Sequence, residues 1–358
     1  MNSNLTWQNV LRVAWLTGGV VAINEPGADV EIKAGLNGKH IETFQISDYG
    51  SLFPTLRRRG FTIIGVTFVT DRRQLESIRP PEFRVMNPLR SWLIWEVKQQ
   101  WRQIASAAST SNMPLMSIAS RIASRLQYSQ MRLVDLASAY SIQLGAYLHE
   151  ADPSEYKAFQ DEYCSEVYKA IHALFWEMAV LRDNLAEFAA RFCFSIATVS
   201  IMSSLRNKLK SFSTDPLARE ILEATDESSK GWLVQFSEFR NCFTHVAPME
   251  QAAGIAFAVQ DMRRVSNGLS IPQMYYALPQ DIGGVKRKWA GGSFVTSFEE
   301  LIATASRRHE RGLEPDALEY LHDCINRFGE LAAKMIARSP TPPKPIHITP
   351  RGGVVKSG

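Results

Sequence analysis

Cysteine is scarce in this sequence. The 358 residues contain four, at positions 164, 193, 242 and 324, and none of them stands in a CxxC pair or at the His/Cys spacing of a zinc site. The spacing therefore gives no indication of disulfides or of a structural metal, and we expect reduced thiols in a cytoplasmic protein. With 45% hydrophobic residues, a chain of this length can bury a core without such cross-links.

Long hydrophobic runs are also missing. The one N-terminal apolar run, residues 13–23, contains Thr17 and a pair of glycines and is too short to cross a membrane. We interpret it as a strand, and expect neither a signal peptide nor membrane association. The formal charge of +4 is only mildly basic, so it permits contact with a phosphate backbone without requiring it.

Several enzyme classes have no motif here. The sequence contains no Walker loop, no GxSxG, no HExxH and no glycine-rich dinucleotide fingerprint, so we expect neither a cofactor nor a metal ion. Two glycine pairs, at 283–284 and 291–292, flank the basic run 286–288. This segment is either a solvated loop or a loop that follows an RNA backbone.

The pattern of residue types changes near residue 86, from short β-branched runs to a helical pattern. Residues 1–86 hold short β-branched runs separated by turn residues, which predicts a small mixed α/β or β domain. Within it, residues 30–33 and 41–46 flank Asn37-Gly38, a favoured hairpin turn, and residues 61–69 predict a buried strand. Asn87-Pro88 is then typical of a helix start.

Residues 87–338 are predominantly helical in pattern. Helices are predicted over residues 88–108, 114–128, 131–149, 154–195, 199–211, 216–225, 229–246, 297–311 and 315–337. Possible strands at 254–259 and 274–278 form an insertion within about 254–295, and the tail 339–358 is predicted to be disordered. The predicted fold class is therefore mainly α, an up-and-down helical bundle with a small strand-containing N-terminal domain.

Residues 229–248 combine an apolar stripe with a polar cluster. At about 100° per residue, four aromatic residues fall within a stripe roughly 60° wide, which predicts the buried face: Trp232, Phe236, Phe239 and Phe243. Arg240 lies at the edge of this stripe, whereas Asn241 and His245 lie together on the opposite side. The polar pair is therefore predicted to point away from the core.

This polar cluster is suited to phosphodiester chemistry. Pro248 disfavours helix at the residue before it, so His245 is predicted in the last turn, where the helix dipole favours an imidazolium. An imidazole can transfer protons near neutral pH, and an arginine one turn away can hold a phosphate. The alternative is structural: Arg240 forms an ion pair with Asp183 or Glu187, and His245 caps the helix.

The arrangement Arg240-Asn241-(three residues)-His245 resembles the RxxxxH motif of the HEPN (higher eukaryotes and prokaryotes nucleotide-binding) family. The resemblance implies a HEPN-like helical bundle that forms a homodimer, in which two such motifs face a shared cleft. It also implies that Arg240, Asn241 and His245 are catalytic residues of a metal-independent endoribonuclease.

The implied reaction is attack of a ribose 2'-hydroxyl on the adjacent phosphorus of an RNA substrate, with His245 in proton transfer and Arg240 stabilising the phosphorane. The resemblance further implies a role as a toxin, stress factor or anti-phage defence effector, with an antitoxin or regulatory partner. The alternative function is a non-catalytic helical interaction or RNA-binding module.

Overall fold

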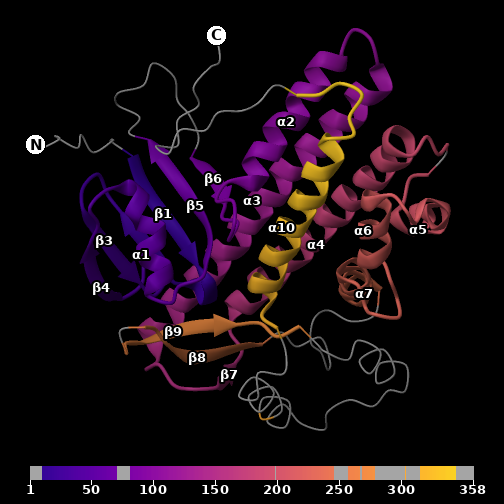
Figure 1. Ribbon diagram of the computed structural model, residues 1–358. Helices are drawn as coiled ribbons and strands as arrows, with labels where there is room; N and C mark the ends of the chain where they lie inside the picture. The colour runs from indigo at the N-terminus through magenta and orange to yellow at the C-terminus, as the bar shows by residue number, and fades with distance from the viewer. Residues whose placement is uncertain are drawn as a thin grey trace, which may run out of the picture.

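The computed structural model of the chain describes residues 10–70, 81–197, 199–245, 257–266, 268–278, 303 and 315–343, except for the side chains of residues 70 and 243–245. An antiparallel sheet lies beside a group of long helices, and a second, smaller sheet lies at one end of both (Figure 1). Among the described helices, none combines the length and the apolar character that a membrane span requires.

The larger sheet has six strands in the order β4-β3-β2-β1-β5-β6, and all neighbours are antiparallel. Its strands are β1 (Val10–Leu16), β2 (Val21–Asn24), β3 (Asp29–Lys33), β4 (His40–Gln45), β5 (Ile63–Thr70) and β6 (Glu82–Val85), with helix α1 (Leu52–Arg58) between β4 and β5. The predicted hairpin and the predicted strand at 61–69 are confirmed. The run 13–23 is two strands rather than one, because Gly18 and Gly19 adopt positive φ and turn the chain.

The described helices after the sheet are α2 (Leu93–Ala108), α3 (Met113–Glu150), α4 (Glu162–Phe188), α5 (Met202–Leu209), α6 (Pro216–Ala224), α7 (Trp232–His245) and α10 (Ala317–Ile336). Helix α3 spans both helices predicted at 114–128 and 131–149, since no glycine or proline separates them and Ser129 and Gln130 are buried. Helix α10 lies across α2, α3 and α4 (Figure 1).

A second sheet, in the order β7-β8-β9, consists of β7 (Lys157–Phe159), β8 (Ala258–Arg264) and β9 (Ser270–Tyr275). Strand β7 replaces the predicted first turns of the helix at 154–195. Tyr156 has a φ of 55°, and the Asp161 carboxylate caps α4 by accepting from the amide of Cys164 at 2.9 Å, so the helix begins after the strand. The predicted strands at 254–259 and 274–278 correspond to β8 and β9 only in part.

The predicted fold class is therefore wrong. The chain is not mainly α with a small strand-containing domain, because six strands form the larger sheet and three more form a sheet within the region predicted to be a helical bundle. The fold is a mixture of helices and antiparallel sheets. The error has a physical cause: β7 gains its backbone partners from β8, far along the chain, and no local pattern signals that pairing.

The larger sheet meets α3 with almost no space between the two backbones. A Cβ on Gly19 would lie 2.6 Å from the carbonyl oxygen of Tyr140, and a Cβ on Gly35 would lie 2.4 Å from that of Ser141. Next to Gly35, the amide of Leu36 donates to the Ser141 hydroxyl at 2.7 Å. Buried residues of sheet and helices consequently form one hydrophobic cluster. The division of the chain at residue 86 stays a prediction.

A buried carboxylate joins the second sheet to the helices. Asp316 caps α10 by accepting from the amides of Leu318 and Glu319, and it also accepts from the amide of Tyr276 and the hydroxyl of Tyr140, both at 2.9 Å. Burial, and secondarily the charge of Glu319, raise the pKa of Asp316 to about 7, although the hydrogen bonds from Tyr276, Glu319 and Tyr140 act in the opposite direction.

Some predicted features lie outside the described residues. These are the basic loop at 283–292, the helix at 297–311 apart from residue 303, and residues 344–358 of the predicted disordered tail.

The contact between sheet and α3 generates a first prediction. In Gly35→Ala the added methyl group clashes with backbone atoms of Ser141 and Gly145, which the hydrogen bonds of α3 hold in place. The substitution should lower the free energy of unfolding by about 2–4 kcal/mol, measured in urea titrations. Gly268→Ala is the matched control, because its φ of 81° is close to the 91° of Gly35 and no atom lies within 4 Å of its Cβ. Equal losses for the two variants would show that the contact is unimportant.

Asp316 generates a prediction about pH. An unfolded aspartate releases its proton near pH 4, whereas folded Asp316 keeps it until about pH 7. The folded state thus binds the proton more tightly, and this group makes the free energy of unfolding fall as pH rises from about 4 to about 7, by on the order of 4 kcal/mol. Asp316→Asn should remove that slope in unfolding measured at several pH values. An unchanged slope in the variant would contradict the assignment.

Candidate functional site

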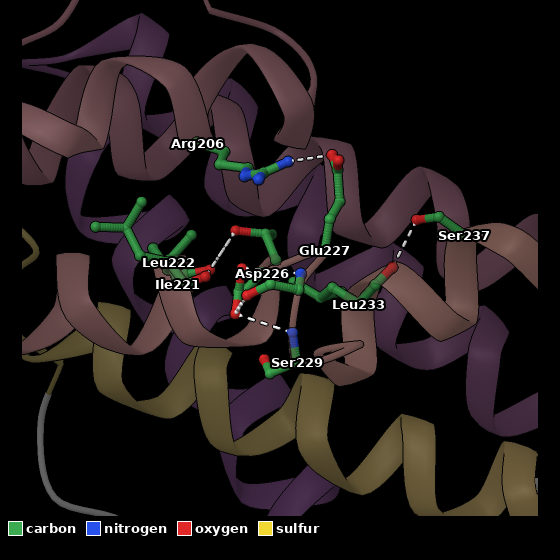
Figure 2. A network of polar contacts seen from close by, with 10 residues as sticks. Arg206, Ile221, Leu222, Asp226, Glu227, Ser229, Leu233 and Ser237 are labelled. Carbon is green, nitrogen blue, oxygen red and sulfur yellow. Dashed lines mark hydrogen bonds and ion pairs between the residues drawn. The ribbon is translucent and has the colours of Figure 1, made fainter.

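The start of α7 is fixed by a hydrogen-bonded turn (Figure 2). The Asp226 carboxylate accepts from the Ser228 hydroxyl at 2.7 Å and from the amides of Ser228 and Ser229 at 3.1 Å, and these bonds hold the pKa of Asp226 well below its usual range. The Asp226 carbonyl accepts from the amide of Gly231 at 2.8 Å, and Glu227 pairs with Arg206 of α5. The direction of α7 is therefore set by its preceding turn.

Of the four aromatic residues predicted to face inward, Phe236 and Phe239 are buried and Trp232 is partly buried against Phe328, while the side chain of Phe243 lies outside the described residues. Phe236 is fully buried, with its ring centroid 5.6 Å from that of Phe175 on α4 and 5.3 Å from that of Phe328 on α10. Phe239 is also buried, 5.1 Å from the ring of Tyr320 on α10. Helix α7 is thus held by α4 and α10 through its apolar face.

Arg240 and Asn241 lie together at the outer side of this helix. Asn241 is exposed and Arg240 is half-buried, and Nη1 of Arg240 donates to Oδ1 of Asn241 at 3.0 Å. The guanidinium carbon of Arg240 lies 5.3 Å from the ring centroid of Trp176 on α4, whose side chain is 55% exposed. His245 is the last residue of α7, and its side chain lies outside the described residues.

The two carboxylates considered as ion-pair partners of Arg240 are engaged by other arginines. Asp183 accepts from Nε of Arg182 at 2.9 Å, and Glu187 accepts from Nη2 of Arg121 at 2.8 Å. Arg182 also donates to the hydroxyl of Ser237 at 2.9 Å, which ties α4 to α7. Glu187 therefore links α4 to α3 through Arg121, whereas Asp183 binds the neighbouring Arg182 on its own helix.

A cavity of about 430 Å³ lies near the other end of α7, where Trp232 and the buried His322 contribute to its wall. Its lining also includes three carboxylates and one guanidinium, from Glu220, Asp323, Glu330 and Arg327. Such a wall repels a polyanion, so this cavity is a poor site for a nucleic acid.

Comparison with known proteins adds nothing to this description, since no family model, curated protein or solved structure matches the chain. In the part of the chain that the structure describes, no three His, Cys, Asp or Glu side chains gather in a way that could hold a metal ion.

Sequence reasoning missed Trp176 as a member of the site. At about 100° per residue, Trp176 falls on the side of its helix opposite the buried Ile171, Leu174 and Met178, and this spacing is the signal that could have marked it as exposed. The sequence did not show that α7 would bring Arg240 to the indole, because that depends on which helices pack together.

The packing of α7 generates a prediction about stability. Phe236→Ala opens a cavity between three helices and should lower the free energy of unfolding by about 3–5 kcal/mol, measured in denaturant. Trp176→Ala is the control, since an exposed ring with one cation–π contact should cost less than about 1 kcal/mol. A small loss for Phe236→Ala would contradict the account of how α7 is held.

Proposed function

We propose that this chain is a metal-independent endoribonuclease of HEPN type, with Arg240, Asn241 and His245 as its catalytic residues. The observation that best supports the proposal is the position of Arg240 and Asn241, which are hydrogen-bonded to each other beside an exposed tryptophan. A guanidinium and an amide are groups that bind a phosphate, and here they are carried by a helix whose apolar face is firmly packed.

In the proposed reaction, the ribose 2'-hydroxyl attacks the adjacent phosphorus, and the bond to the 5'-oxygen of the next nucleotide breaks. His245 takes the proton of the 2'-hydroxyl or gives one to the leaving oxygen. Arg240 stabilises the negative charge of the phosphorane, while Asn241 holds the guanidinium in place or contacts the phosphate. The products are a 2',3'-cyclic phosphate and a 5'-hydroxyl.

The proposal also covers the oligomeric state and the cellular location of the protein. One motif supplies a single histidine, whereas the reaction needs one group to accept a proton and another to donate one, so we propose a homodimer whose second copy supplies the other. We also propose action in the cytoplasm, where the four free cysteines would stay reduced. A role as toxin, stress factor or anti-phage effector, with a regulatory partner, belongs to the same proposal.

The test is cleavage of single-stranded RNA in the presence of EDTA. Loss of a proton-transfer group typically costs about 10²–10⁴ in rate, so His245→Ala should be slower than wild type by that factor. Arg240→Ala removes charge stabilisation and should be slower by about 10²–10³. His149→Ala and Arg191→Ala, at exposed positions near the ends of α3 and α4, are matched controls that should keep wild-type activity.

The product ends and the substrate provide a second measurement. Mass spectrometry should detect 2',3'-cyclic phosphate ends, and RNA methylated at every 2'-oxygen should resist cleavage. Cleavage that needs a divalent metal, or that survives either Arg240→Ala or His245→Ala, is incompatible with the proposal. RNA that is bound but not cleaved by the wild-type chain would favour the non-catalytic alternative.

A further inference from the structure

Trp176 is unusual among the aromatic residues of this fold. It is the one tryptophan among the exposed large hydrophobic side chains of the described residues, and it lies on α4, where Phe175, Tyr168 and Phe188 are buried and Tyr163 is exposed. An indole exposes a large flat apolar surface, which water solvates poorly. The exposed indole of Trp176 is therefore suited to stacking against a flat ligand.

A second exposed ring lies on the neighbouring helix. Tyr128 of α3 is 45% exposed, and the guanidinium carbon of Arg125 lies 5.6 Å from its ring centroid. Nη1 of Arg125 also donates to Oε1 of Glu177 at 2.8 Å, and Glu177 directly follows Trp176 in the chain. Residues 176–177 of α4 therefore contact Arg240 of α7 through the ring of Trp176, and Arg125 of α3 through the carboxylate of Glu177.

We infer that these four residues, Arg240, Trp176, Arg125 and Tyr128, form a track that binds single-stranded RNA, with one base stacked on each ring. The inference rests on the proposed function, because it extends the substrate contacts of that site from α7 across α4 to α3. Trp176 holds the nucleotide beside Arg240, and Tyr128 holds one farther from the scissile phosphate.

The chemistry of the track fits an unpaired nucleic acid. Bases of any kind stack on aromatic side chains, and arginine adds both phosphate binding and stacking of its own plane. Each exposed ring here has a guanidinium within 6 Å, so base and phosphate contacts are available at both positions. A base-paired duplex has no free base faces to offer, so the track selects single strands.

A second copy of the chain is the competing occupant of this surface. Stable interfaces between proteins bury about 800 Å² on each partner around an apolar centre. Here each exposed ring lies next to a guanidinium, that of Arg240 at Trp176 and that of Arg125 at Tyr128, so the two rings do not form such an apolar centre. The alternation of rings and charges favours RNA over a protein partner.

The experiment measures binding separately from cleavage. The probe is a fluorescein-labelled 12-nucleotide RNA methylated at every 2'-oxygen, which cannot supply the attacking hydroxyl, and binding is followed by fluorescence anisotropy in EDTA. Because stacking of one base changes affinity by about 5- to 100-fold, Trp176→Ala should raise Kd by about 10-fold. Trp176→Phe, which keeps an aromatic face, should restore most of the affinity.

The position of the second ring gives a sharper test. Tyr128→Ala should weaken binding of the 12-nucleotide probe but leave binding of a probe too short to span both rings unchanged. Tyr163→Ala is the matched control, because Tyr163 is a 40% exposed aromatic residue of α4 outside the track. Scanning abasic positions along the 12-nucleotide probe should weaken binding to the wild type at two positions, and at only one in Trp176→Ala.

The outcomes separate the track from the catalytic proposal. If Arg240→Ala and His245→Ala abolish cleavage while Trp176→Ala and Tyr128→Ala bind normally, the track is wrong and the nuclease stands. If binding depends on both rings while the wild type cleaves no RNA, the track stands and the nuclease is wrong. If Trp176→Ala instead dissociates a dimer, as seen by sedimentation, and leaves RNA affinity unchanged, a second copy covers this surface.

Discussion

The direct contact between two turns of the larger sheet and the backbone of α3 is the constraint on which the arrangement of the fold depends. At Gly19 and Gly35 the chain approaches α3 so closely that a side chain could not fit. Glycine is the residue that accepts both this distance and the positive φ found at these turns. The long helix is thereby fixed against the sheet; α2, α4 and α10 pack directly on α3, and α5 and α7 pack on α4.

The order of dependence runs from the sheet to the candidate site. Helix α4 lies along α3 through ion pairs such as Arg125–Glu177, and α7 lies on α4 through the ring of Phe175. Arg240 and Asn241 are thus two helices removed from the rigid centre. Their surroundings are determined by packed rings rather than by loops, which favours a site with a fixed geometry.

The sequence predicted the elements that depend on neighbouring residues. The Asn37-Gly38 pair predicted the hairpin, and the 3.6-residue period predicted α7 and its buried aromatic residues. Asp215-Pro216 is typical of a helix start, and in the structure the Asp215 carboxylate accepts from the amide of Leu217 at the start of α6. The sequence did not predict β7, whose three residues pair with a strand beyond α7. Nor did it predict the contact of Arg240 with Trp176. Both depend on which distant segments meet, and periodicity carries no information about that.

Helix α10 has a consequence for the order in which the chain can fold. Its residues supply partners to groups made much earlier: Asn326 binds Asn87 across 239 positions, and Asp316 binds Tyr140 across 176. During synthesis these earlier groups lack their native partners until residues 316–326 have left the ribosome. Asn87 and Tyr140 thus stay without these partners during synthesis. A chain released before residue 316 also lacks the residues of α10 that complete the hydrophobic core.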